Sequence, residues 1–202
     1  MKEKNLELDR LVFFSDAVVA IAITLLALDL KVEHTATNHL TFSDIGGSWH
    51  KFVAFSLSFL NIAIFWTIHH KFFAHIKKID RKLMRYNIGW LLFIITLPYS
   101  ASLISSYFFD TPAIFIYSLN TLLITLFQNW IWDYVAVRPE FLKDSVDETT
   151  IYNYKLSCNI AIINALIAVG LSFVSSRAAF IILFTRLPMI WVARLFFKPA
   201  NK

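Results

Sequence analysis

Long apolar stretches alternate with short polar segments along the whole chain. Each stretch is about 20 residues long, which is the length that a helix needs to cross a lipid bilayer. The stretches are rich in Leu, Ile, Phe and Ala and lack the two-residue alternation of a membrane β-barrel strand. The pattern predicts six transmembrane helices, approximately over residues 11–30, 52–73, 86–108, 113–137, 156–176 and 178–197.

The composition agrees with a membrane protein. Of the 202 residues, 57% are hydrophobic and 16% are charged, whereas soluble domains have about 45–50% apolar and about 25% charged residues. Six spans of about 20 residues leave little chain outside the bilayer, so we expect residues 1–202 to form a single all-α transmembrane domain. The one cysteine, Cys158, excludes a disulfide scaffold and is expected to be a small apolar packing residue.

The distribution of Lys and Arg predicts the orientation in the membrane. Basic residues gather at both termini and in the segments that follow the second and the fourth predicted helices, while the opposite side has only Lys31, Lys51 and Arg177. Since basic segments stay in the cytoplasm, we expect a multi-pass protein of the cell membrane with both termini cytoplasmic. The net charge of +5 is then a signal of topology and not of a nucleic-acid-binding surface.

Polar residues inside the predicted spans are few, and each is a candidate for function because burying it in lipid is costly. Asp16 in the first helix, His69 in the second and Asn87 in the third lie near the cytoplasmic third of the membrane. Arg10 and Asp133 lie near the same depth. We therefore predict one polar cluster that ties the first three helices together.

Two further side chains carry expectations about pairing. The indole N–H of Trp66 is expected to donate to Asp16 or to Ser15. Arg186, close to Pro188 in the last predicted span, is expected to pair with an acidic group or to extend toward the membrane surface.

The first helix carries a motif, Arg-x-x-x-Phe-Ser-Asp, formed by Arg10, Phe14, Ser15 and Asp16. With this motif the chain resembles the transmembrane protein 175 family of potassium channels. The resemblance covers the six-helix layout, although its specific motifs lie in the first half of the chain. Supporting residues in the second and third helices are Phe65, Trp66, His69, His70, Asn87, Leu97 and Pro98.

The resemblance implies a homotetramer of six-helix subunits in which the first helix lines the pore. It also implies a passive cation channel with potassium as the permeant ion, weakly preferred over sodium, and without the usual potassium selectivity filter. In agreement with this last point, the sequence contains no Thr-Val-Gly-Tyr-Gly. The family's narrow hydrophobic constriction corresponds to Ile21, Leu25 and Leu28 in this chain.

Helical geometry can be compared with this assignment. At 100° per residue, Leu25 and Leu28 fall within about 40° of Ile21, so the three form one apolar stripe. Spacing alone favours ordinary packing residues, and it is the resemblance that makes them a constriction. Ser15 and Asp16 fall off the stripe, which suggests that they tether the helix to its neighbours.

Polar residues near the stripe suggest further roles. Thr24 lies beside it, and four copies of its hydroxyl would form a polar layer that replaces some of the water lost by an ion. Whether Thr24 or the aliphatic ring at Ile21 sets the selectivity stays open. Asp29 and Glu33, four positions apart near the outer end of the first helix, are expected to concentrate cations at the outer mouth.

Two other classes of protein stay open. A proton-coupled transporter subunit would need acidic or histidine side chains in a relay across the midplane, whereas the polar groups here gather at one depth. An intramembrane enzyme would need an oriented nucleophile and base, and nothing in the sequence orients Ser15 toward His69, so we expect no enzymatic activity. His69, His70 and His75 lack the spacing and the acidic partners of a metal site, so we expect no metal and no other cofactor.

Overall fold

The computed structural model describes residues 2–32, 39–186, 188–190 and 192, and these form helices joined by short connections. Five of the helices are long and apolar enough to cross a membrane. The all-α class is therefore confirmed, and five of the six predicted spans correspond to candidate membrane-spanning helices. In chain order the elements are α1 (Lys2–Leu25), η1 (Leu26–Asp29), α2 (Phe42–Gly47), α3 (Trp49–His75), α4 (Arg81–Ser106), α5 (Thr111–Ala136), η2 (Pro139–Phe141), α6 (Glu148–Ser172) and α7 (Ser176–Phe184).

The helix expected over residues 178–197 is interrupted at Thr185, and residues 186, 188–190 and 192 are helical again. Helix α7 has 9 residues and ends at Phe184. Pro188 lacks the N–H that would bond to the Phe184 carbonyl, and a proline ring clashes with the carbonyl four residues earlier. Asn164 on α6 stabilises the chain at this interruption, because its Nδ2 donates to the Ile182 carbonyl and to the Thr185 hydroxyl, each over 3.0 Å. Residues 187, 191 and 193–197 of the predicted span lie outside the described part of the chain.

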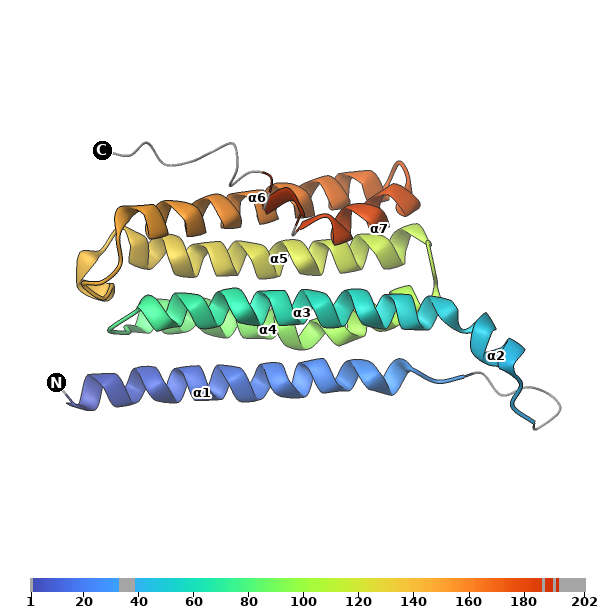
Figure 1. Ribbon diagram of the computed structural model, residues 1–202, viewed down its shortest axis with the longest axis horizontal. Coiled ribbons are helices and arrows are strands. Elements are labelled where there is room, and N and C mark those ends of the chain that lie inside the picture. The colour runs from blue at the N-terminus through green and yellow to red at the C-terminus, as the bar shows by residue number, and fades with distance from the viewer. Residues whose placement is uncertain (1, 33–38, 187, 191, 193–202) are drawn as a thin grey trace.

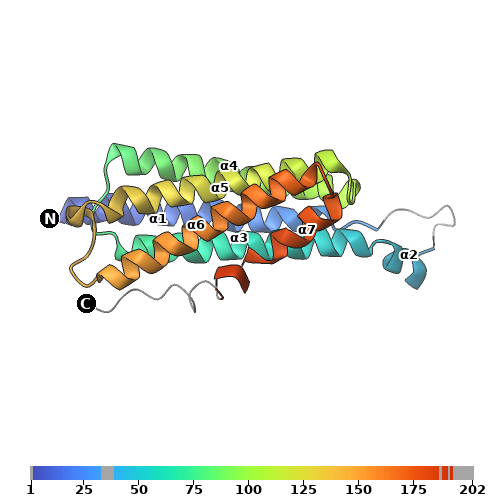
Figure 2. The same ribbon diagram turned by 90° about the horizontal axis from the view of Figure 1, so that it is seen from above.

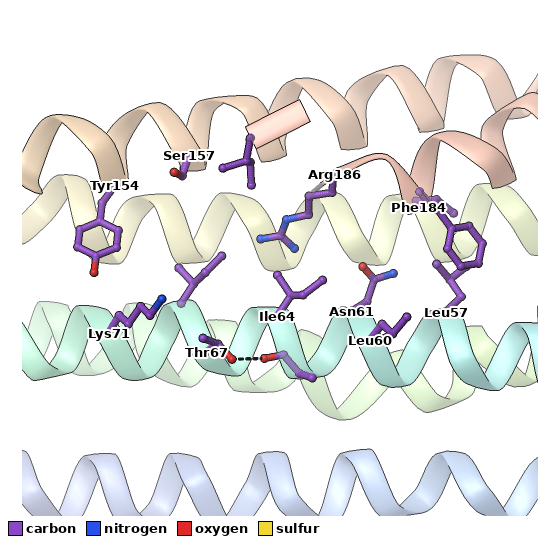
Figure 3. Close-up of a pocket in the computed structure, with 14 residues that line it drawn as sticks. Leu57, Leu60, Asn61, Ile64, Thr67, Lys71, Tyr154, Ser157, Phe184 and Arg186 are labelled. Carbon is purple, nitrogen blue, oxygen red and sulfur yellow. Dashed lines mark hydrogen bonds between the residues drawn. The ribbon is translucent and has the colours of Figure 1, made fainter. Parts of the chain in front are cut away.

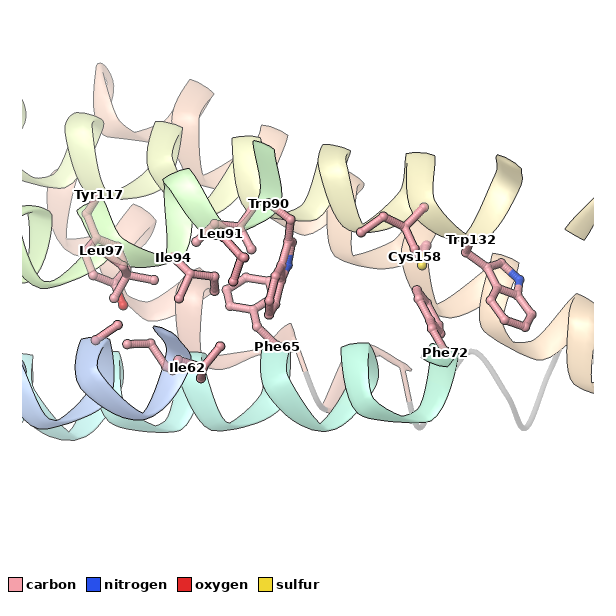
Figure 4. Packing of buried hydrophobic residues seen from close by; sticks show 14 of the residues in the cluster. Ile62, Phe65, Phe72, Trp90, Leu91, Ile94, Leu97, Tyr117, Trp132 and Cys158 are labelled. Atoms are coloured by element: carbon pink, nitrogen blue, oxygen red, sulfur yellow. The ribbon is translucent and has the colours of Figure 1, made fainter. Parts of the chain in front are cut away.

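The long helices lie side by side along one direction (Figures 1 and 2). Helix α1 forms one edge of the bundle and packs against α3 and α4, while α5 contacts α4 and α6, and α7 runs back along α6. The core between these helices is filled by large aromatic side chains, of which Phe65, Phe72, Trp90, Tyr117 and Trp132 are fully buried (Figure 4). These rings fix α3, α4 and α5 as the centre of the fold.

The basic connections meet at one end of the bundle, which is also the end where α1 begins (Figure 1). The N–H of Lys77, after α3, donates to the Phe141 carbonyl over 2.8 Å, and the N–H of Lys143 donates to the His75 carbonyl over 2.9 Å. Lys77 Nζ also lies 2.7 Å from the Asp144 carboxylate. The segments after α3 and after α5 are therefore held together as one unit.

Asp80 begins α4 within this unit. Its Oδ1 accepts from the N–H groups of Lys82 and Leu83, over 3.1 and 2.8 Å, and its Oδ2 accepts from the Tyr134 hydroxyl. Burial raises the pKa of the Asp80 carboxyl, but the hydrogen bonds from Leu83, Tyr134 and Lys82, and the nearby Arg138 guanidinium, together hold this pKa below its ordinary value. The carboxylate therefore joins the start of α4 to the end of α5.

Candidate functional site

Helix α1 is attached to the bundle by one face. Its buried residues recur every three or four positions, as expected for one side of a helix. This buried stripe packs against α3 and α4, and it consists of Leu11, Ser15, Val19, Ala22 and Leu26.

The opposite face of α1 is apolar and uncovered in the single chain. Ile21 is 61% exposed, Leu25 is 42% exposed and Leu28 is 63% exposed, and Phe14 lies on the same side of the helix at 57%. In the most apolar part of this first span, within Leu6–Asp29, only 28% of the residues are buried. The corresponding share is 39–61% in the four other long helices. Lipid or another protein chain must therefore cover this face.

Thr24 is exposed on α1 beside the apolar stripe, and its hydrogen bond limits what it can do chemically. Its hydroxyl donates to the Ile21 carbonyl over 2.8 Å. Since the only hydrogen is used in this bond, the oxygen has only lone pairs left for other partners. Thr24 is thus set up to accept a hydrogen bond or to contact a cation.

A directed chain of hydrogen bonds anchors α1 to α3 and α4. The Asn87 amide nitrogen donates to the Ser15 hydroxyl over 2.8 Å, and Ser15 donates to the Leu11 carbonyl over 2.8 Å. His69 Nε2 lies 2.6 Å from Asn87 Oδ1. Because this amide oxygen only accepts, His69 carries its hydrogen on Nε2.

The His69 ring is held inside the bundle by stacking as well. It is 1% exposed, and its centroid lies 4.1 Å from that of Trp90 with an angle of 13° between the planes. Within the described ranges no group of three or more His, Cys, Asp or Glu side chains is placed to hold a metal ion. His69 is therefore positioned as a structural link between helices.

A second anchor joins α1 to α3 one residue further along. Trp66 Nε1 donates to Asp16 Oδ1 over 2.8 Å. Asp16 and Ser15 thus use adjacent positions to hold two side chains of α3 and α4, and both point away from the exposed stripe.

The expected cluster is smaller than the sequence indicated. Arg10 is exposed, and no hydrogen bond or ion pair joins it to Asp16, Trp66 or Asn87, all of which the structure describes. Asp133 lies on α5, where it accepts from Asn129 of the same helix over 2.9 Å, and it lies 3.9 Å from Lys155 Nζ on α6. Similar depth did not imply contact, because Asp133 belongs to a helix that does not pack against α1.

The outer end of the first helix contains one residue of the expected acidic pair, Asp29. The helix tightens into η1 and ends at Asp29, and residues 30–32 are not helical. Glu33, the second residue of the expected pair, lies outside the described residues. Asp29 alone marks this end of the exposed stripe.

Arg186 lies where sequence reasoning did not place it. No ion pair with an acidic residue is formed within the described part of the chain, and the guanidinium carbon instead lies 4.1 Å from the centroid of the Phe65 ring. Arg186 lines a cavity that no sequence pattern could locate, although an arginine in an apolar span was itself a signal. Cys158 is buried, as expected.

Comparisons with known proteins agree on one family. A family described as "Endosomal/lysosomal potassium channel TMEM175" matches residues 10–98. A protein named as a potassium channel from Chamaesiphon minutus is 30% identical over 175 residues, which cover 84% of this chain and 86% of the relative. One of the same description from Streptomyces collinus is 29% identical over 174 residues, 84% of each chain. An endosomal/lysosomal proton channel TMEM175 from Gallus gallus is 28% identical over 150 residues, but these cover only 29% of that relative.

Solved structures give the same result. The crystal structure of a lysosomal potassium-selective channel TMEM175 homolog from Chamaesiphon minutus matches with a TM-score of 0.79 and 25% identity, covering 93% of this chain and 96% of that one. The crystal structure of a variant of the potassium channel MtTMEM175 matches with a TM-score of 0.66 and 17% identity, covering 93% and 92% of the two chains, which supports the fold.

Proposed function

Since this multi-pass membrane protein belongs to the TMEM175 family of ion channels, we propose that it is a potassium channel whose pore is lined by α1 from four copies of the chain. The observation that carries the proposal is the exposed stripe of Ile21, Leu25 and Leu28 on a helix that is firmly anchored by its other face. Because these anchors prevent α1 from rotating about its own axis, every subunit would present the same residues to the central axis of the tetramer.

Four copies would convert this stripe into rings. Ile21 would form an apolar ring, and Leu25 and Leu28 would form two more toward the outer end. Hydrophobic rings control conduction through their width, because a narrow ring excludes water and a slightly wider one passes a partly dehydrated ion. Potassium gives up its hydration shell more easily than sodium, so the proposed pore favours potassium weakly and needs no backbone-carbonyl filter.

Thr24 gives this pore a polar layer. Its hydroxyl hydrogen is bonded to Ile21, and the remaining lone pairs suit a cation that has lost part of its water. Asp29, at the end of η1, would add negative charge at the outer mouth and raise the local cation concentration. The anchors at Ser15, Asp16, Trp66, His69 and Asn87 would position the rings without contacting the ion.

The orientation follows from charge. The basic segments after α3 and α5 lie at the same end as the beginning of α1, and basic segments stay in the cytoplasm. We propose that this end faces the cytoplasm and that both termini of the chain are cytoplasmic.

Ion flux measured in liposomes tests the proposed activity. The purified full chain is reconstituted with a potassium gradient, and the reversal potential is measured in mixed potassium and sodium and then with a proton gradient. Passive, electrogenic flux with a modest preference for potassium supports the channel. Flux that requires protons would instead favour a proton-coupled transporter, and flux of protons alone would favour the permeant ion named for the vertebrate relatives.

Cysteine cross-linking tests the proposed assembly. Single cysteines replace Ile21, Leu25 or Leu28 in a chain that also carries Cys158→Ala. We expect cross-links between subunits, assembly into tetramers and block of flux by silver ions. A cysteine replacing Ile181, equally exposed at 62% but on α7, is the matched control and should give no block. Cross-linked dimers with unblocked flux would overturn the four-fold pore.

A further inference from the structure

A cavity of about 380 Å³ lies between α3, α6 and the segment that follows α7 (Figure 3). Most of its lining is apolar, with Leu57, Leu60 and Ile64 from α3 and Leu183 and Phe184 from α7. The cavity is therefore a site that suits a hydrocarbon chain, apart from two charged side chains.

Arg186 is the first of these side chains. It is only 3% exposed, and its Nε and Nη1 have no hydrogen-bond partner among the described residues. The Phe65 ring covers one face of the guanidinium, with 4.1 Å between the ring centroid and the guanidinium carbon. A stacked ring attracts the cation but cannot accept the N–H hydrogen bonds, so the edge of the guanidinium is left without a partner.

Lys71 is the second charged side chain. It lines the end of the cavity that lies toward the basic end of the bundle, four residues before α3 ends at His75. Figure 3 shows its ammonium group and the Arg186 guanidinium extending toward each other along the cavity. No carboxylate is present among the described lining residues, so the space between the two cations is positive and has no counter-charge.

We propose that this cavity binds the headgroup of an anionic phospholipid. A buried, unpaired charge is costly unless it is hydrogen-bonded to an opposite charge, and a phosphate oxygen would supply charge and acceptors to Arg186 and Lys71 together. The acyl chains would lie on the apolar wall around Leu60 and Ile64. This inference concerns a face of the chain other than the exposed stripe of α1, and it does not depend on the ion that is conducted.

Binding is tested with the purified full chain in a neutral detergent. Its melting temperature is measured while phosphatidylglycerol, phosphatidylcholine or inorganic phosphate is added. We expect phosphatidylglycerol to raise the melting temperature, phosphatidylcholine to have little effect, and inorganic phosphate to have little effect because it lacks acyl chains. In Arg186→Gln the apparent affinity for phosphatidylglycerol should fall about tenfold or more, and in Arg186→Lys it should fall less.

The matched control is Arg177→Gln, which removes an arginine whose guanidinium carbon lies 5.6 Å from the centroid of Phe109, away from this cavity. It should keep the affinity of the unmodified chain. Leu60→Trp provides a variant that retains both charges: Leu60 is 53% exposed, so the larger ring should fill the mouth of the cavity and weaken binding without disturbing the core.

Three results would overturn the proposal. Equal stabilisation by the two phospholipids would remove the role of charge, and stabilisation by inorganic phosphate alone would indicate a free anion. Unchanged phosphatidylglycerol binding in Arg186→Gln, together with loss of the tetramer, would mean that a second copy of the chain covers Arg186. Loss of ion flux in any of these variants is a separate readout and tests the channel rather than this site.

Discussion

The indole nitrogen of Trp66 donates to Asp16 Oδ1 over 2.8 Å, and the two residues lie 50 positions apart on α3 and α1. This bond and the one from Asn87 to Ser15 fix the rotation of α1 against the bundle. With that rotation fixed, the apolar stripe headed by Ile21 faces outward. The residues that would face the proposed pore are therefore determined by the polar anchors on the opposite side of the same helix.

Removing the Asp16 carboxylate should disturb assembly more than selectivity. In Asp16→Ala the Trp66 N–H loses its acceptor, and an unsatisfied polar group costs about 1–3 kcal/mol. We expect a lower melting temperature and a lower yield of tetramer, measured by thermal unfolding and size-exclusion chromatography, with an unchanged permeability ratio in the tetramers that form.

Trp66→Phe should have a similar effect, and the two substitutions together should cost less than their sum because they remove one shared bond. Glu7→Ala, which changes an exposed acid on the same helix, is the control and should be neutral. Well-assembled Asp16→Ala tetramers with an altered permeability ratio would place Asp16 in the ion path.

Replacing Ile21 by Asn should increase the sodium leak. An amide wets an apolar ring and lowers the barrier to a more fully hydrated ion. We expect larger sodium currents and a reversal potential that moves toward equal permeability for potassium and sodium. Ile181→Asn changes a residue of nearly equal exposure on α7, 62% against 61%, and should leave the reversal potential unchanged. If the two variants behave alike, Ile21 has no special place in the pore.

Gly89 permits close approach of α4 and α5. A Cβ atom added there would lie 2.1 Å from Cε1 of the Phe127 ring, and this ring is held by Phe93 and Trp130, whose centroids lie 5.6 and 4.8 Å away. Gly89→Ala should therefore destabilise the chain by about 1–3 kcal/mol, as overpacking in a core does. The melting temperature measures this effect.

Gly170→Ala is the matched control on α6. A Cβ atom at this position has open space within 4 Å, and Ala is favoured over Gly inside a helix by about 0.8–1.0 kcal/mol. This variant should be neutral or stabilised. A shorter side chain at 127, as in Phe127→Leu, should restore part of the loss in Gly89→Ala, and an unchanged melting temperature in Gly89→Ala alone would contradict the close contact.

Hydrophobic length predicted the five long spans because each stretch meets the bilayer requirement by itself. The same reasoning did not reveal the interruption of the last predicted span, which lies close to Pro188 and to the hydrogen bonds from Asn164. Hydropathy averaged over a whole span is insensitive to such a break, since the polar residues Thr185 and Arg186 stand between apolar residues on both sides.

Contacts between distant residues were only partly predictable. The pairing of Trp66 with Asp16 followed from donor and acceptor chemistry at similar depth. Asp133 lies at a similar depth but does not contact them, because depth does not say which helices are neighbours. The cavity at Arg186 depends on how α7 folds back along α6 (Figure 2), and no local pattern encodes that.

Acidification should weaken the link between α4 and α5 at Asp80. The folded pKa of this carboxyl lies below its ordinary value of 3.8, so its stabilisation is fully present above that value and is lost as the pH falls through the folded pKa. Asp80→Asn keeps a side chain able to cap the helix but removes the charge. The unmodified chain should thus melt at a higher temperature than Asp80→Asn at about pH 6, and the difference should shrink below about pH 3.8 as the carboxyl becomes protonated. Asp110→Asn, at a helix start where the side chain makes no capping hydrogen bond, should show no such pH-dependent difference. A constant difference between the unmodified chain and Asp80→Asn down to about pH 2 would mean that the charge of Asp80 does not stabilise the fold.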